Sequence, residues 1–276
     1  MPNPDSAKSS PDAEKVNRYS AILEAVFFKH YKAGCKEFEF EREEIEQVAA
    51  KLKLKLPKNI GDLLYSFRFR TKLPDSITKT AATKREWVIE LAGKAKYAFR
   101  QLKINRVVPS ETAYQIKIPD ATPEIITMYA KTDEQALLAK VRYNRLIDVF
   151  LRITAHSLQS HLRTTVPGVG QIEVDELYVG VRNTGQQFII PVQAKGGTDQ
   201  IGATQVRQDL EFCKHSFPAL SPRAVAVQFI GTDVIAMFEL VFQGENLSVI
   251  DEKHYRLVAG GDISPDDLTT MANASQ

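Results

Sequence analysis

The chain has 276 residues, of which 43% are hydrophobic and 25% charged, and its formal net charge is +2. This composition predicts a packed globular protein and excludes an intrinsically disordered chain. No apolar run approaches the roughly 18 residues that a membrane span needs, and the two cysteines are too few and too far apart for a disulfide framework or a zinc site. We therefore expect a reduced, cytoplasmic protein with no membrane partner.

The N-terminal part of the chain predicts a tail followed by helices and a ribbon. Residues 1–14 are polar and rich in proline and serine, which is typical of a loose tail and not of a signal peptide. Apolar residues at helical spacing follow over 15–33, and then a short strand, KEFEFE. Two more helices, REEIEQVAAKLKL and NIGDLLYSFRFR, are separated at Pro57. The segment EWVIELAGKAKYAFRQLK predicts two strands with a turn at Gly93–Lys94.

Basic residues dominate 51–106, whereas acidic residues gather at 38–46, around 173–176 and after 245. A local basic block is typical of a protein that binds a polyanion, although a solvated lysine-rich surface shows the same pattern. The order of three helices and a basic two-stranded ribbon resembles a winged helix, a common DNA-binding module. This resemblance implies DNA contacts from the end of the third helix and from the ribbon, through Arg68, Arg70, Lys94, Lys96 and Arg100.

The segment VVPSETAYQIKIPDATPE carries three prolines and predicts a domain boundary near residue 120. It would separate an N-terminal, winged-helix-like α+β domain over 15–120 from a second domain over 121–276. The second domain opens with a long helical pattern, DEQALLAKVRYNRLIDVFLRI. Three strands follow, HSLQSHLRTTV, QIEVDELYVGV and QFIIPVQAK, and then the helix TQVRQDLEFCKH and the strands RAVAVQFI and VIAMFELVF. This order predicts an α/β domain built around a central sheet.

Polar residues interrupt two of these apolar strands. Side chains alternate between the faces of a strand, so Glu173 and Asp175 share one face of the first strand, and Gln193 and Lys195 share one face of the second. If the two strands form a hairpin, Asp175, Gln193 and Lys195 converge. A carboxylate, an amide oxygen and an ammonium group at one place suit Mg²⁺-assisted hydrolysis of a phosphodiester, because Mg²⁺ prefers oxygen ligands and a cation stabilises the developing negative charge.

An acid in one strand and an acid-x-lysine pair at the end of the next resembles the PD-(D/E)xK nuclease superfamily of restriction endonucleases. Asp175 matches the first acid and Lys195 the lysine, while Gln193 stands 18 positions after Asp175 where the family has an acid. The resemblance covers about 133–240. It implies a central mixed sheet flanked by helices, Asp175 and Gln193 as Mg²⁺ ligands, and Lys195 as the residue that positions the attacking water.

The glutamine brings no charge to this site, so a further acid is expected to supply one. The acids that we weigh for this role are Glu173, Glu176 and Glu134, with Glu173 the first choice as a ligand. The resemblance adds Gln205, on the following helix, as an auxiliary residue. Arg163, on the strand before Asp175, is expected to contact DNA phosphate. A degenerate site and a plain surface hairpin are the other interpretations of the same residues.

These expectations combine into a Mg²⁺-dependent endonuclease that acts on double-stranded DNA. Restriction of foreign DNA is the role we expect, since nucleases of this resemblance without a motor domain often serve it, and the chain has no nucleotide-binding loop of the Walker type. Two alternatives stay open: a repair or recombination nuclease of the same fold, and a DNA-binding regulator that has lost its metal. The oligomeric state, including a homodimer, also stays open.

Overall fold

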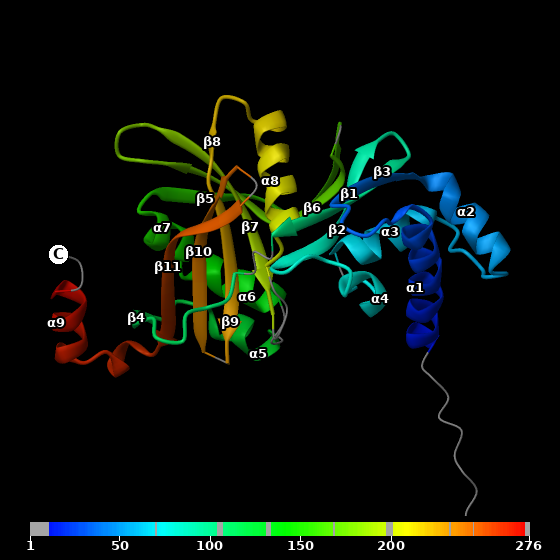
Figure 1. Ribbon diagram of the computed structural model, residues 1–276. Helices are drawn as coiled ribbons and strands as arrows, with labels where there is room; N and C mark the ends of the chain where they lie inside the picture. The colour runs from blue at the N-terminus through cyan, green and yellow to red at the C-terminus, as the bar shows by residue number, and fades with distance from the viewer. Residues whose placement is uncertain are drawn as a thin grey trace, which may run out of the picture. The chain divides into compact units, whose positions relative to one another are not determined.

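The computed structural model describes residues 11–69, 71–103, 107–130, 134–167, 169–196, 201–231, 233–244 and 246–273. The chain divides into two compact units, Met1–Ile104 and Asn105–Gln276 (Figure 1). The sequence predicted this boundary near residue 120, at the proline-containing segment. The strand at 115–119 instead pairs with a strand near the C-terminus, so the second unit begins earlier than the composition suggested.

The first unit contains helices and a small sheet. Its elements are α1 (Pro11–His30), β1 (Glu37–Glu41), α2 (Arg42–Lys51), α3 (Ile60–Phe69), α4 (Asp75–Thr78), β2 (Arg85–Gly93) and β3 (Lys96–Lys103). Helix α1 begins at Pro11, inside the tail that we expected over 1–14, and residues 1–10 of that tail lie outside the described residues. The ribbon turns at Gly93, as the sequence predicted.

The sheet of the first unit is antiparallel, in the order β1-β3-β2. Its core is aromatic. Phe27 of α1 lies in the centre, fully buried, with its ring centroid 4.9 Å from that of Phe99, 5.1 Å from that of Trp87 and 5.2 Å from that of Phe38. These edge-to-face contacts join α1 to all three strands, because Phe38, Trp87 and Phe99 belong to β1, β2 and β3.

The second unit is larger and contains most of the strands. Its elements are β4 (Gln115–Pro119), α5 (Glu124–Tyr129), α6 (Glu134–Tyr143), α7 (Leu146–Leu151), β5 (Thr154–Val166), β6 (Gly170–Val181), β7 (Gln187–Lys195), α8 (Ala203–Ser216), β8 (Ser221–Pro222), β9 (Ala224–Ile230), β10 (Val234–Gln243), β11 (Asn246–Val258), a 3₁₀ turn (Gly260–Asp262) and α9 (Pro265–Asn273). In the part of the chain that the structure describes, no helix of either unit is both long enough and apolar enough to cross a membrane.

The strands of the second unit form one mixed sheet in the order β4-β11-β10-β9-β7-β6-β5, with β8 beside β7. Strands β5, β6 and β7 form an antiparallel meander, and β9 lies parallel to β7 after the α8 crossover. The order of helix, three strands, helix and strand is the one that the sequence predicted. The expected α/β class, with a mixed sheet flanked by helices, is confirmed. Strands β4 and β11 and helix α9 were not predicted.

Helices cover both faces of this sheet, so its central strands are apolar on both sides. In β9, Val225 and Val227 pack in the core that includes α6 and α7, while Ala224 and Ala226 pack in the core that includes α8. The near-continuous apolar run of this strand is therefore explained by its burial on both faces. Polar residues on β6 and β7 have to be accommodated between the sheet and these helices.

The long helix expected over 133–153 is two helices, α6 and α7, with a corner at Asn144. The side chain of Asn144 is buried, and its Oδ1 accepts a hydrogen bond from the backbone N–H of Ala121 at 2.7 Å. Its Nδ2 donates to Thr122 Oγ1 at 3.0 Å and to the carbonyl of Lys140 at 3.0 Å. Arg145, with φ at 50°, then turns the chain out of the helix. The corner thus ties the segment before α5 to α6.

Replacing Asn144 with alanine should destabilise the second unit, because it leaves the Ala121 N–H and the Lys140 carbonyl without this partner. We expect the free energy of unfolding to fall by about 2 kcal/mol. Urea denaturation measures this change, with Gln186→Ala, on an exposed turn, as the control that should change little. Equal stability of the Asn144 variant and the wild type would contradict the structural role of the corner.

Candidate active site

Asp175 and Gln193 lie side by side on neighbouring strands. The antiparallel ladder of β6 and β7 includes the pair Glu176 and Val192, and the backbone N–H of Ala194 donates to Asp175 Oδ2 at 2.9 Å just beyond it. Gln193 is only 2% exposed, and Asp175 is partly buried. The structure thus brings Asp175, Gln193 and Lys195 to the same end of the hairpin, as the alternation of side chains predicted.

Asp209 of α8 is a part of this site that the sequence did not identify. Its Oδ2 accepts a hydrogen bond of 2.6 Å from Gln193 Nε2, and Asp209, like Gln193, is 2% exposed. The signal that could have found it is its spacing, since Asp209 stands on the same stripe of the helix as the buried residues Val206 and Cys213.

Two oxygen atoms of this pair have no hydrogen-bond donor. Gln193 Oε1 and Asp209 Oδ1 are buried, and neither accepts a hydrogen bond from any residue that the structure describes. A buried acceptor without a donor carries an uncompensated desolvation cost. A cation bound beside these oxygens would offset that cost, so the arrangement favours a cation ligand.

The carboxyl groups of Asp175 and Asp209 both bind protons more readily than usual. Burial raises the pKa of Asp175, and the Ala194 N–H and the Lys195 charge oppose that rise. Burial raises the pKa of Asp209 well above its ordinary value; the Gln193 hydrogen bond opposes the rise and the charge of Asp175 adds to it. Two carboxylates in one buried place repel each other, and binding of a proton or of a cation relieves that repulsion.

Lys195 lies between acidic groups at the edge of the site. Its Nζ is 3.5 Å from Glu134 Oε1, and its side chain is only 16% exposed. Its charge also lowers the pKa of Asp175 and that of Asp209, against the larger effect of burial on both. Glu134, the first residue of α6, is therefore in the site as the ion-pair partner of the lysine, and its charge adds to the rise in the pKa of Asp175.

The other expected auxiliary acids are occupied elsewhere. The carboxylate of Glu173 pairs with Arg163 at 2.9 Å, and the contact of Glu173 with Gln193 Nε2 is made by its backbone carbonyl at 3.4 Å. Glu176 is fully buried next to Asp175 in the chain, where it accepts hydrogen bonds from Arg142 Nε at 2.9 Å and Ser157 Oγ at 2.6 Å. Strand alternation directs Glu176 away from Asp175.

Gln205, expected to assist the site, is partly buried on α8. It precedes Asp209 by four residues, so the two stand on the same side of the helix, one turn apart. Gln205 is therefore one turn from the buried Asp209 on α8.

The basic residues of the first unit that we expected to contact DNA differ in whether their charges are paired with carboxylates. Lys96 pairs with Glu39 at 3.1 Å, and Arg100 bridges Glu37 and Glu90, with 2.6 Å to the second. Cross-strand pairs of this kind neutralise the ribbon, because all of these residues lie on the three strands of the small sheet.

The other three residues of the first unit that we expected to contact DNA are Arg68, Arg70 and Lys94. Burial lowers the pKa of Arg68, whose guanidinium is largely enclosed, so this side chain does not face solvent as a phosphate contact would. Arg70 lies outside the described residues. Lys94 is exposed at the tip of the ribbon, and it forms no ion pair with the described residues.

No group of three or more histidine, cysteine, aspartate or glutamate side chains is placed to hold a metal ion within the described parts of the chain. The oxygens gathered here come from two carboxylates and one amide. Such a set is compatible with Mg²⁺, which commonly binds one or two carboxylates and keeps several waters.

Comparison of the chain with protein-family models, with curated proteins and with solved structures returned no match. The function therefore has to be argued from the chemistry of the site itself.

Asp209 should make the stability of the second unit depend on pH. A carboxyl whose pKa is raised on folding stabilises the folded state fully at a pH below its unfolded pKa of about 3.9. This stabilisation is lost as the pH rises through the higher pKa of the folded state. Asp209→Asn carries no charge, so it should gain stability over the wild type as the pH rises from 4 to 8.

Urea denaturation in EDTA, at pH 4 and at pH 8, measures this difference between Asp209→Asn and the wild type. Glu211→Gln serves as the control, because Glu211 lies on the same helix but is half-exposed and paired with Lys214 at 2.8 Å. A difference between the Asp209 variant and the wild type that stays constant with pH would contradict the shifted pKa.

Proposed function

We propose that this protein is a Mg²⁺-dependent DNA endonuclease whose second unit hydrolyses phosphodiester bonds. The observation that carries the proposal is the convergence of Asp175, Gln193, Lys195 and Asp209 at one end of two neighbouring strands. A pair of raised carboxyl pKa values beside a partly buried lysine is typical of functional sites.

Asp175, Gln193 and Asp209 would hold the metal ion. The two buried oxygens without a hydrogen-bond donor, on Gln193 and Asp209, are the observation that supports this ligand set. A bound Mg²⁺ would supply a Lewis acid for the phosphoryl group and lower the pKa of a water.

The protein's own residues would set the geometry of the reaction. The Ala194 N–H fixes the orientation of the Asp175 carboxylate. Asp209 holds the nitrogen of the Gln193 amide, so the amide oxygen is directed to the opposite side. Lys195 would stabilise the negative charge that develops on the phosphoryl oxygens and orient a water. Glu134 would hold the lysine side chain in position through their ion pair at 3.5 Å.

The glutamine in place of an acid has a physical rationale in Asp209. A glutamate at position 193 would direct one carboxylate at another in a buried place, whereas the amide donates a hydrogen bond to Asp209. The negative charge that the sequence lacked at position 193 is thus supplied by Asp209, from α8.

We further propose that the first unit docks on DNA as a winged-helix-like module. Its order of helix, strand, three helices and two strands, with the sheet order β1-β3-β2, supports this. Because the ribbon is neutralised by ion pairs, we assign the DNA contacts to exposed lysines between α2 and α3 and at the ribbon tip. These are Lys51, Lys53, Lys55, Lys58 and Lys94.

Removal of the charged groups of the site should abolish cleavage. We expect Asp175→Ala and Lys195→Ala to lower the rate of Mg²⁺-dependent plasmid cleavage by about 100-fold or more, because both act on charge in the transition state. Glu211→Gln, on the solvent side of α8, is the control. Rates like those of the wild type in either site variant would overturn the assignment.

The same assay separates the alternative functions. Cleavage of unmodified foreign plasmid supports restriction, which is the role we propose, and cleavage of branched DNA alone would select repair or recombination. A regulator without activity is the alternative favoured by the small number of carboxylates at the site. DNA binding with no cleavage at any Mg²⁺ concentration would select it.

The lysines between α2 and α3 should carry the electrostatic part of DNA binding. In the Asp175→Ala background, we expect Lys53→Glu with Lys55→Glu and Lys58→Glu to weaken duplex binding and to reduce the slope of log K against log salt by about 2 to 3. Lys214→Glu, an exposed lysine of α8, is the control. If the triple variant keeps the wild-type slope, these lysines do not contact DNA.

A further inference from the structure

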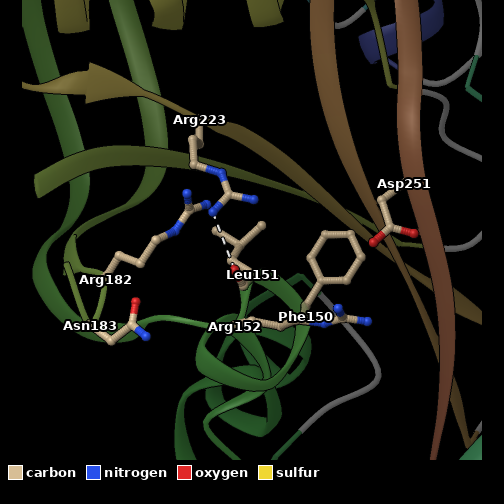
Figure 2. Close-up of a pocket in the computed structure, with 7 residues that line it drawn as sticks. All are labelled: Phe150, Leu151, Arg152, Arg182, Asn183, Arg223 and Asp251. Carbon is tan, nitrogen blue, oxygen red and sulfur yellow. Dashed lines mark hydrogen bonds between the residues drawn. The ribbon is translucent and has the colours of Figure 1, made fainter. Parts of the chain in front are cut away.

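A second polar pocket lies at the end of β6 and β7 that is opposite to Asp175 and Lys195. Its volume is about 590 Å³, and the turn between β6 and β7 forms part of its wall (Figure 2). The residues that line it are Phe150, Leu151, Arg152, Arg182, Asn183, Arg223 and Asp251. A volume of this size is typical of small-molecule sites.

Arg223 is the fixed arginine of this pocket. Its Nε and Nη2 donate to the two oxygens of Glu239 at 2.6 and 2.8 Å, and its Nη1 donates to the carbonyl of Leu151 at 3.2 Å. This fork is a strong, directional arrangement. Arg223 therefore has its charge neutralised and its guanidinium plane held in place.

Arg182 brings a second guanidinium to the same place. Its carbon Cζ lies 5.3 Å from the ring centroid of Phe188, and that of Arg223 lies 5.4 Å from the same ring. Figure 2 shows the two guanidinium groups directed toward one another. Arg182 forms no ion pair with a carboxylate of the described residues, so this end of the pocket carries excess positive charge.

Arg152 adds a third guanidinium from the end of α7. Its φ of 54° is in the left-handed region, where glycine would be favoured, and its side chain extends past Phe150 (Figure 2). A strained residue with a long charged side chain at the wall of a pocket points to a role for that side chain. Among the described residues, Arg152 also forms no ion pair with a carboxylate.

The opposite side of the pocket has a different chemistry. Phe150 is only 5% exposed, so the accessible surface here comes from the planar guanidinium of Arg152, and Asp251 presents a carboxylate beyond Phe150 (Figure 2). Asp251 is 3.7 Å from Lys253 on its own strand, which is a loose surface pair. A ligand that spans the pocket would thus carry an anion at one end and a hydrogen-bond donor on a flat ring at the other.

We propose that this pocket binds a nucleoside monophosphate whose base carries an exocyclic amine. Arg182, beside Arg223 and Asn183, receives the phosphate, because guanidinium groups bind phosphate oxygens in pairs. The base stacks on the planar guanidinium of Arg152, and its amine donates to Asp251. This site is independent of the proposed nuclease function, since none of its residues belongs to the Asp175 site.

Isothermal titration of the full chain in EDTA, with 5′-AMP as the probe, tests the proposal without any cleavage. We expect Arg182→Gln to weaken AMP binding by about tenfold or more, as loss of a hydrogen-bonded charge does. Arg152→Gly should also weaken it while the fold is kept, because glycine suits this φ. Arg145→Gln, an exposed arginine outside the pocket, is the matched control.

Related probes separate the parts of the ligand. Adenosine and inorganic phosphate should each bind more weakly than AMP. In the wild type, 5′-IMP, which lacks the exocyclic amine, should also bind more weakly than AMP. In a variant without the Asp251 carboxylate, AMP and IMP should bind equally. The Asp251→Asn variant tests that condition. Absence of AMP binding, equal binding by Arg182→Gln, or equal affinity for AMP and inorganic phosphate would overturn the proposal. So would binding of a 5′-phosphorylated DNA hairpin through Arg182 without binding of AMP.

Discussion

The buried hydrogen bond between Gln193 and Asp209 is the interaction on which the proposed active site depends. It joins β7 to α8 at a point where both side chains are removed from water, so neither group can lose its partner without a cost. It also decides which atom of the amide faces the site. The contact therefore links α8, which packs on the sheet through Val206, Phe212 and Cys213, to the chemistry available beside Asp175.

The hairpin of β6 and β7 has opposite electrostatic character at its two ends. At one end, acids from β6, α6 and α8 surround one lysine, and burial holds the pKa values of two of them high. At the other end, Arg182 and Arg223 lie over Phe188 and Arg152 extends past Phe150; among the described residues, only Arg223 of these three is paired with a carboxylate. The proposed cation site and the proposed nucleotide site thus lie at opposite ends of the same hairpin.

The charge that the first unit presents to a binding partner is the charge that remains after its ion pairs are formed. The sequence shows a basic block over 51–106, but the acids of β1 and β2 neutralise the arginine and lysine of the ribbon. The lysines left exposed include the run of alternating lysine and leucine over 51–56, Lys58 and the lysine at the ribbon tip, together with Lys72, Lys79, Lys84 and Lys103. Net electrostatic attraction follows this remaining set, and not the composition of the block.

The sequence by itself determined those features of the structure that depend on the local periodicity of apolar residues. Alternation placed Asp175, Gln193 and Lys195 together because adjacent strands joined by a short turn have a register that the apolar pattern sets. It also determined most helices and strands and the α/β class. Tertiary structure decided the contacts that join distant segments: Asp209 against Gln193, β4 beside β11, the ion pairs of Arg100, the corner at Asn144, and the arginine pocket. These depend on which surfaces pack together, and residues far apart in the chain leave no periodic signal of that choice.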